Sequence, residues 1–164
     1  MKAEDYINGL NMLPHPEGGF FKENFKSDEI IHKDHLPDRY VNHRVFSTSI
    51  YFLLRSSDVS KLHRIKSDEL WYFHSGSPVK IVCLSEKKGY FDFTLGNDIS
   101  KGQLPQAIVE YGVWFGAYVL EENSYSLVGC NVAPGFDFED FEMGEREYLL
   151  KLFPDHKDII LKLT

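Results

Sequence analysis

Short apolar segments with a two-residue period recur along the middle of this chain, and they constrain its fold more than any other feature. Residues 47–54 place Ser47, Ser49 and Tyr51 on one face and mainly apolar side chains on the other, which is the alternation of a half-buried strand. Similar segments follow at roughly ten-residue spacing, separated by Gly, Pro, Ser and Asn. They are residues 61–65, 69–74, 79–85, 90–95, 106–109, 113–120 and 125–133. The pattern predicts an all-β sandwich or jelly roll.

The two ends of the chain carry a different pattern. Residues 3–10 gather apolar side chains on one helical face before Pro14, so a short N-terminal helix is expected. Residues 141–164 are also helical in character, and we expect them to pack as a cap on the outside of the β-structure. The polar stretch 23–43 predicts a solvated loop or a flap over a pocket. No linker or repeat is visible, so residues 1–164 are expected to form one domain.

Composition and charge exclude several classes of function. The 164 residues carry a formal net charge of −7, which leaves no basic surface to neutralise a nucleic-acid backbone. No apolar run approaches the roughly eighteen residues that span a bilayer. The first five residues lack an apolar signal region, so a cytoplasmic protein is predicted. Cys83 and Cys130 stand apart in apolar runs, and we expect both to be buried, reduced and structural.

One hairpin concentrates the candidate site residues. His63 is followed two residues later by Ile65, then by Glu69, with a turn glycine at Gly76. Alternation predicts that Glu69, Trp71 and Phe73 share a wall with His63. That wall combines an imidazole, a carboxylate and aromatic surface, which are typical constituents of a ligand pocket. The alternative is a purely structural role, in which His63 forms a hydrogen bond to a backbone carbonyl.

Other side chains are weaker candidates, each with a structural alternative. Tyr51 and Ser49 would face the pocket together, with Tyr51 as a proton donor opposite His63, although buried tyrosines more often bond a backbone group. Arg64 would orient an anionic ligand, or form a surface salt bridge. The further candidates for ligand contacts are the stacking surface of Trp114, the neighbouring Phe115, and the side-chain amide of Gln106. For both tryptophans, filling of the core is the competing interpretation.

Four longer motifs resemble an uncharacterised cupin family, a domain of unknown function also called cupin family five. They are Leu13-Pro14-His15-Pro16-Glu17-Gly18-Gly19, Ser67-Asp68-Glu69, Gly112-Val113-Trp114 and the run from Val128 to Phe138. The resemblance implies a double-stranded β-helix, the jelly-roll barrel of cupins, similar to that of sugar-nucleotide epimerases and commonly found as a homodimer. A barrel of this size holds one small ligand. A fold alone does not assign an activity.

The same resemblance bears on metal binding. The cupin pattern takes three ligands from the first motif and a final His from the second, but here Ile65 and Phe115 stand at two of these positions. Two ligands are too few for catalytic zinc or iron, unless His74, His15 or Glu17 joins from elsewhere. A site without metal or cofactor is therefore predicted.

Three functions remain open at the level of sequence. The first is a small-molecule site, with a sugar or nucleotide-like molecule as the candidate ligand and metal-independent isomerase or epimerase chemistry by His63, Glu69 and Tyr51. The second is a ligand-binding or sensing module without catalysis. The third, a metal-dependent oxygenase or hydrolase, is disfavoured by Ile65 and Phe115. Whether the chain is an enzyme stays undecided.

Overall fold

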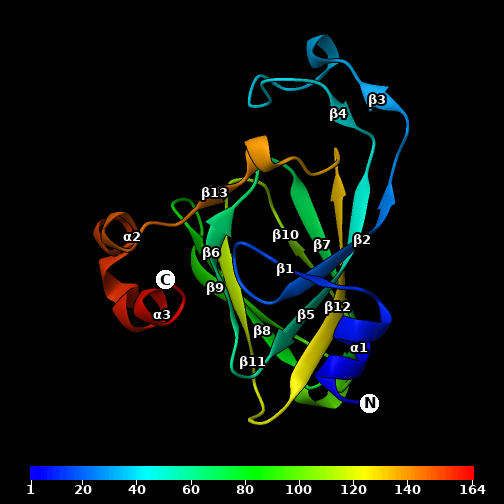
Figure 1. Ribbon diagram of the computed structural model, residues 1–164. Helices are drawn as coiled ribbons and strands as arrows, with labels where there is room; N and C mark the ends of the chain where they lie inside the picture. Colours follow the sequence, from blue (N-terminus) through cyan, green and yellow to red (C-terminus); the bar gives the residue numbers. More distant parts are fainter.

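Two antiparallel sheets face each other in the computed structural model, which describes residues 1–164 (Figure 1). The larger sheet has the order β1-β2-β5-β12-β7-β10 and the smaller one β13-β6-β11-β8-β9. The larger contains β1 (Leu13–Pro14), β2 (Phe20–Lys26), β5 (Thr48–Arg55), β12 (Tyr125–Ala133), β7 (Asp68–Gly76) and β10 (Gln106–Val109). The smaller contains β13 (Glu142–Met143), β6 (Val59–Arg64), β11 (Trp114–Val119), β8 (Val79–Ser85) and β9 (Gly89–Leu95). This is the predicted jelly-roll architecture.

The remaining elements are short. Strands β3 (Ile30–Ile31) and β4 (Arg44–Val45) form a separate hairpin beyond the end of the large sheet (Figure 1). The helices are α1 (Ala3–Gly9), α2 (Arg146–Leu152) and α3 (Lys157–Lys162). Single 3-10 turns are η1 (Lys33–His35), η2 (Ile99–Lys101), η3 (Phe138–Asp140) and η4 (Pro154–His156). None of the helices has the length and apolar character needed to cross a membrane.

The main core lies between the two sheets. Its 17 buried residues come from alternate positions of facing strands, including Phe52 of β5, Trp71 of β7 and Phe115 of β11. The two-residue period seen in the sequence is the cause, because successive side chains of a strand point to opposite faces. Both cysteines are buried and unpaired, as predicted.

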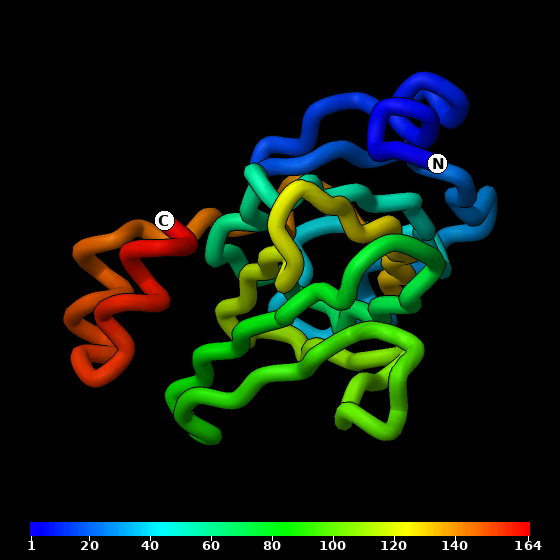
Figure 2. The backbone as a smooth tube through the Cα atoms, turned by 90° about the horizontal axis from the view of Figure 1, so that it is seen from below, coloured from blue at the N-terminus to red at the C-terminus, as the bar shows by residue number.

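The terminal helices cover the outer faces of the sheets, again as predicted. Leu149 of α2 and Ile160 of α3 pack with Leu62, Val82 and Trp114 on the smaller sheet. Figure 2 shows these C-terminal helices lying together on one side of the molecule. A third cluster, made by Ala3, Met12, Leu53 and Leu127, attaches the N-terminal helix to the larger sheet.

The prediction for residues 23–43 was only partly right. Strand β2 continues to Lys26, paired with β5 through a bulge between Glu23 and Phe25. The five residues from Lys22 to Lys26 are exposed, because β1 is only two residues long and leaves most of β2 at the sheet edge. A polar edge strand has no buried face to reveal it in the sequence. Beyond it, the chain runs through the β3 hairpin strand and η1 before β4.

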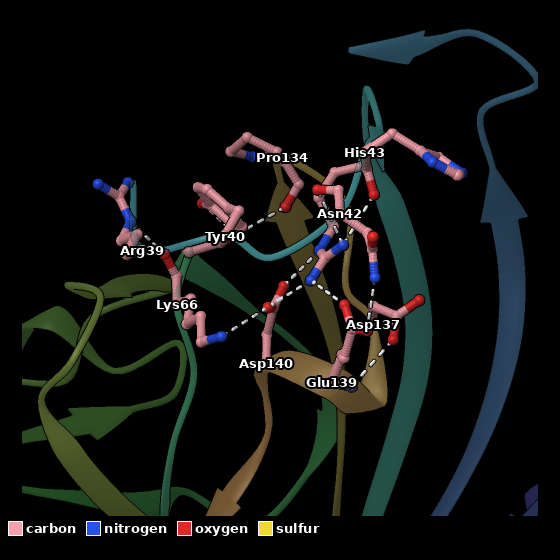
Figure 3. Close-up of polar contacts among 11 residues, drawn as sticks. Arg39, Tyr40, Asn42, His43, Lys66, Pro134, Asp137, Glu139 and Asp140 are labelled. Carbon is pink, nitrogen blue, oxygen red and sulfur yellow. Dashed lines mark hydrogen bonds and ion pairs between the residues drawn. The ribbon is translucent and has the colours of Figure 1, made fainter. Parts of the chain in front are cut away.

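A buried ion network joins the β3–β4 hairpin to η3 (Figure 3). Arg44, which is 3% exposed, donates from Nε and Nη2 to the two oxygens of Asp140, both at 2.6 Å. Its remaining contacts are Glu139 Oε2 at 3.0 Å and the carbonyl oxygens of Asn42 and His43. The bidentate geometry is the strong form of an arginine–carboxylate pair. It holds η3, and with it the chain on either side, against the sheets.

Candidate functional site

An enclosed cavity of about 100 Å³ opens between the sheets at the end near η3. Strand β5 contributes Thr48, Ser49, Ile50 and Phe52; β6 contributes His63; β7 contributes Glu69 and Trp71; and β12 contributes Cys130 and Val132. The other lining residues are His15, Glu17, Phe21, Glu23, Ile65, Phe136, Phe138 and Phe141. By volume the cavity would hold roughly seven to ten water molecules, so it suits one small ligand.

His63 and Glu17 form a buried pair at the base of the cavity. His63 Nδ1 lies 2.7 Å from the carbonyl oxygen of Lys61, and its Nε2 lies 3.1 Å from Glu17 Oε2. A carbonyl only accepts, so Nδ1 must carry a proton. The Nε2–Oε2 contact then holds one further proton, on either the carboxyl or the imidazole. Burial lowers the pKa of His63 and raises that of Glu17 to about 7, which favours a neutral imidazole beside a protonated Glu17.

Glu17 reaches the cavity from outside the predicted strands. It lies in the bend between β1 and β2, where Gly18 has φ +118° and a Cβ would fall 2.1 Å from the carbonyl oxygen of Val59. Only glycine fits this turn. Glu17 Oε1 accepts from the Ser60 hydroxyl at 2.7 Å, and His15 Nδ1 lies 3.3 Å from Glu17 Oε2. The bend therefore places a carboxyl between two imidazoles.

Glu69 lies close to this pair but has different surroundings. Its side chain is buried, and it lines the cavity without any nitrogen or hydroxyl donor of the protein on its oxygens; the Cys130 thiol adjoins it. Burial, reinforced by the nearby Glu17, raises the pKa of Glu69 to about 7. The indole N–H of Trp71, also on the cavity wall, has no partner either. Buried polar groups are nearly always paired, so these two are available to a ligand.

Aromatic rings form the rest of the wall. His15 packs against Phe21, Phe138 and Phe141, with ring centroids 4.9, 6.2 and 6.1 Å away. Phe136 and Phe138 contact each other at 5.1 Å. The run from Phe136 to Phe141 includes η3, so the Arg44–Asp140 pair fixes these rings at the mouth of the cavity. Asp137 accepts from the backbone N–H of Glu139, whereas Asp140 binds Arg44.

Four of the ten predicted site residues line the cavity together: His63, Glu69, Trp71 and Ser49. Phe115 is completely covered, its ring 4.1 Å from that of His63, so it supports the imidazole without facing the cavity. Phe73 packs against the core but does not line the cavity either.

The other four predicted residues lie elsewhere, and the expectation that they face the pocket is wrong. Tyr51 is on the opposite face of β5, in the cluster beneath α1 and 6.0 Å from the ring of His74. Trp114 points outward into the C-terminal helices. Arg64 donates two hydrogen bonds to Glu142 and lies over Trp114. Gln106 is exposed on β10, at the sheet edge.

His15, Glu17 and Cys130 are among the thirteen of the seventeen lining residues that had not been predicted as site residues. His15 and Glu17 belong to the first family motif, and they had been considered only as possible extra metal ligands. Cys130 had been taken as structural. The sequence signal that pointed to Glu17 was the rigid Pro-Glu-Gly-Gly bend, because a turn this tight indicates a specific structural or functional role.

A family model described as "Cupin superfamily (DUF985)" matches residues 4–144. The chain therefore belongs to this cupin family, as its motifs predicted. It is 28% identical over 155 residues to an uncharacterized protein of Saccharomyces cerevisiae, a match that covers 88% of this chain and 77% of the yeast protein.

Solved structures extend the comparison. Protein SO0799 of Shewanella oneidensis is 38% identical, with a TM-score of 0.90 and coverage of 100% of this chain and 98% of its own. A hypothetical protein from Leishmania major is 32% identical, with the same TM-score and coverage of 100% and 99%. Oxalate decarboxylase of Bacillus subtilis is 16% identical with a TM-score of 0.55, covering 92% of this chain and 36% of that enzyme. This last likeness shows a shared fold.

The side chains present do not fit a metal ion. Ile65 and Phe115 supply no ligand atoms at two of the four cupin positions. Of the two His63 nitrogens, Nδ1 donates to a carbonyl and Nε2 faces Glu17, so neither is free. No group of three or more His, Cys, Asp or Glu is arranged to hold a metal. His74 is exposed and on the outer face of β7, so it adds nothing.

Proposed function

We propose that the cavity binds one small molecule and that His63, Glu17 and Glu69 transfer protons to and from it, in a metal-independent isomerisation or epimerisation. The observation that carries this proposal is the gathering of one imidazole and two carboxyl groups in a single enclosed cavity. His63 and Glu17 share one proton through their contact, and Glu69 lines the cavity in which the ligand would bind.

The proton inventory supports acid–base work. When His63 is neutral, its Nε2 is a base that accepts a hydrogen bond from protonated Glu17. Glu69 is a second acid or base. Both carboxyl pKa values are raised to about 7 by burial. Groups whose pKa lies near the working pH are the most effective general acids and bases. Moving a proton from one face of a substrate carbon to another requires such a pair.

The residues that line the cavity restrict the chemical class of the ligand. None of the seventeen lining residues is Lys or Arg, and Arg64 is bound to Glu142 outside. A phosphate or diphosphate would find no positive partner in the cavity. We therefore favour an unphosphorylated small molecule over the nucleotide-like ligand considered from the sequence, and a sugar-like molecule remains compatible with the hydrogen-bonding groups.

Solvent hydrogen exchange tests the proposal. Wild-type protein is incubated in D2O with a panel of unphosphorylated hydroxy, keto and amino compounds, and deuterium incorporation at carbon is followed by proton NMR. We expect incorporation into at least one compound. His63→Asn should abolish it while leaving affinity for that compound nearly unchanged, and Arg64→Gln, outside the cavity, should behave as wild type. Equal exchange in wild type and His63→Asn would refute a role for this imidazole.

The second candidate is a binding or sensing module. Glu69 receives no nitrogen or hydroxyl donor, and the Trp71 indole N–H has no acceptor. Both favour ligand recognition whether or not chemistry follows. Saturable binding to the cavity without exchange in any compound of the panel would support this module and contradict the isomerase.

A further inference from the structure

We infer that the molecule bound in the cavity carries a positive charge on nitrogen, as an alkylammonium or amine group. This inference rests on the proposed function in one respect, namely that the cavity is a small-molecule site. It goes further by naming the chemical class of the ligand.

The first observation is a carboxyl group without a counter-ion. Glu69 is 8% exposed, lines the cavity and has the weak Cys130 thiol as its hydrogen-bond donor, with no Lys or Arg beside it. Burying an unpaired carboxylate is costly, and a cation or a strong donor removes that cost. Elsewhere in this molecule the buried carboxylate of Asp140 has Arg44 as its partner. The cavity has no equivalent residue of its own.

The second observation is the charge of the whole lining. Three carboxyl groups, those of Glu17, Glu23 and Glu69, face the cavity, and no Lys or Arg does. Glu23 is exposed and lies toward the mouth on β2. When these carboxyl groups are ionised, the cleft is lined by one sign of charge, which raises the local concentration of the opposite ion. An anionic ligand would be repelled, whereas an ammonium ion would be drawn in.

The third observation is the aromatic wall. Phe21, Phe136, Phe138 and Phe141 line the cavity together with Trp71. Aromatic faces attract cations through their quadrupole, and several rings around one site are the usual arrangement for alkylammonium recognition. A neutral sugar would not need this combination of rings and unpaired carboxyl groups. An ammonium group uses both.

Binding of isosteric probes tests the inference. Choline is compared with 3,3-dimethylbutan-1-ol, and n-butylammonium with n-butanol, by isothermal titration calorimetry at about pH 8, where carboxyl groups with a pKa near 7 are ionised. Each pair has the same shape and differs in charge. We expect the cation of at least one pair to bind about ten-fold more tightly than its neutral partner. Equal affinity within both pairs, or no binding of either cation, would overturn the inference.

Two variants locate the effect. Glu69→Gln should lower affinity for the cation about ten-fold and leave that of the neutral partner unchanged. Glu110→Gln removes an exposed carboxylate that pairs with Lys88 and does not line the cavity, and should change neither. Cation binding that is insensitive to Glu69→Gln would place the site elsewhere and contradict the inference.

The two proposals fail separately. Cation-selective binding without isotope exchange would retain the ligand class and reject the isomerase. Exchange confined to neutral compounds, with no cation preference, would retain the chemistry and reject the ligand class.

Discussion

Two buried polar clusters lie at the same end of this molecule, and they are built on opposite principles. In the network around Arg44, every strong charge has a partner: Asp140 receives two hydrogen bonds from Arg44 at 2.6 Å, and Lys66 Nζ adds a second cation at 3.6 Å. In the cavity, His63, Glu17 and Glu69 are buried without any cation. There the negative charge of the carboxyl groups is neutralised by protonation, because burial raises both carboxyl pKa values to about 7.

The difference separates a structural cluster from a functional one. A fully paired ion network offers nothing to a ligand, but it fixes η3 and the three phenylalanines around it. The cavity cluster holds protons that can move, and a carboxyl group whose hydrogen-bond donor is a weak one, the Cys130 thiol. Perturbed titration within a cleft is the mark of a functional site, and the first cluster positions the aromatic wall of the second.

The largest expected effect comes from removing the cation of the structural cluster. Arg44→Met leaves the Asp140 carboxylate buried and unpaired, so we expect a loss of about 3–5 kcal/mol in the free energy of unfolding, measured by urea denaturation. The double variant Arg44→Met/Asp140→Leu should recover most of this loss. If the single and double variants were equally destabilised, charge pairing would not explain the role of Arg44.

The next effect is a pH dependence that belongs to the cavity cluster. The pKa of Glu69 is 4.5 in the unfolded chain and about 7 in the folded one, so the folded state keeps a proton that the unfolded state has lost. The free energy of unfolding should therefore fall as pH rises from 4.5 to 7, by about 3 kcal/mol relative to Glu69→Gln. The lowered pKa values of His15 and His63 act in the opposite direction. That of His15 is common to both proteins, whereas that of His63 falls further in Glu69→Gln because the Glu69 charge no longer raises it. Parallel pH profiles would show that Glu69 is not buried as described.

A smaller effect tests the proton assignment. In Glu17→Gln the side-chain amide can still donate to His63 Nε2, so we expect less than about 1 kcal/mol of destabilisation. Hydrogen exchange at substrate carbon should be lost, since an amide does not transfer a proton. Glu17→Leu serves as the comparison: it leaves Nε2 and the Ser60 hydroxyl unpaired and should be clearly less stable than Glu17→Gln.

The smallest effect is expected at the edge of the ion network. Lys66 contacts Asp140 at a longer distance, and its side chain is 31% exposed, so solvent screens much of the attraction. Lys66→Met should cost about 0.5 kcal/mol, and added salt should reduce the difference further. A loss of stability as large as that of Arg44→Met would show that Lys66 and Arg44 contribute equally to the free energy of unfolding.

The fold could be predicted well because the central strands are short, apolar and separated by turn residues, and β5 has a two-residue period. All eight predicted segments coincide with strands to within a few residues, and both terminal helices were expected. It missed the exposed part of β2, since an edge strand with polar side chains on both faces has no period to detect. The hairpin motif correctly brought His63, Glu69 and Trp71 to one wall. It could not choose faces for Tyr51 and Trp114, because aromatic residues fill outer clusters as readily as pockets.

Glu17 shows why the rest of the site was out of reach. It lies 43 residues before Ser60, and only the folded bend brings it to His63. Nothing in the local pattern around Glu17 indicates a distant imidazole.

The bend from Leu13 to Gly19 carries reactive groups of the cavity, whereas the strands that form the framework of the fold lie mainly outside it. The ladders of both sheets beyond β2 form without it, yet it delivers one of the two acids and one of the two imidazoles. A change confined to these seven residues would exchange the reactive group and keep the strands, the aromatic wall and the cavity. The reactive groups and the framework that holds them are thus specified by different segments of the chain.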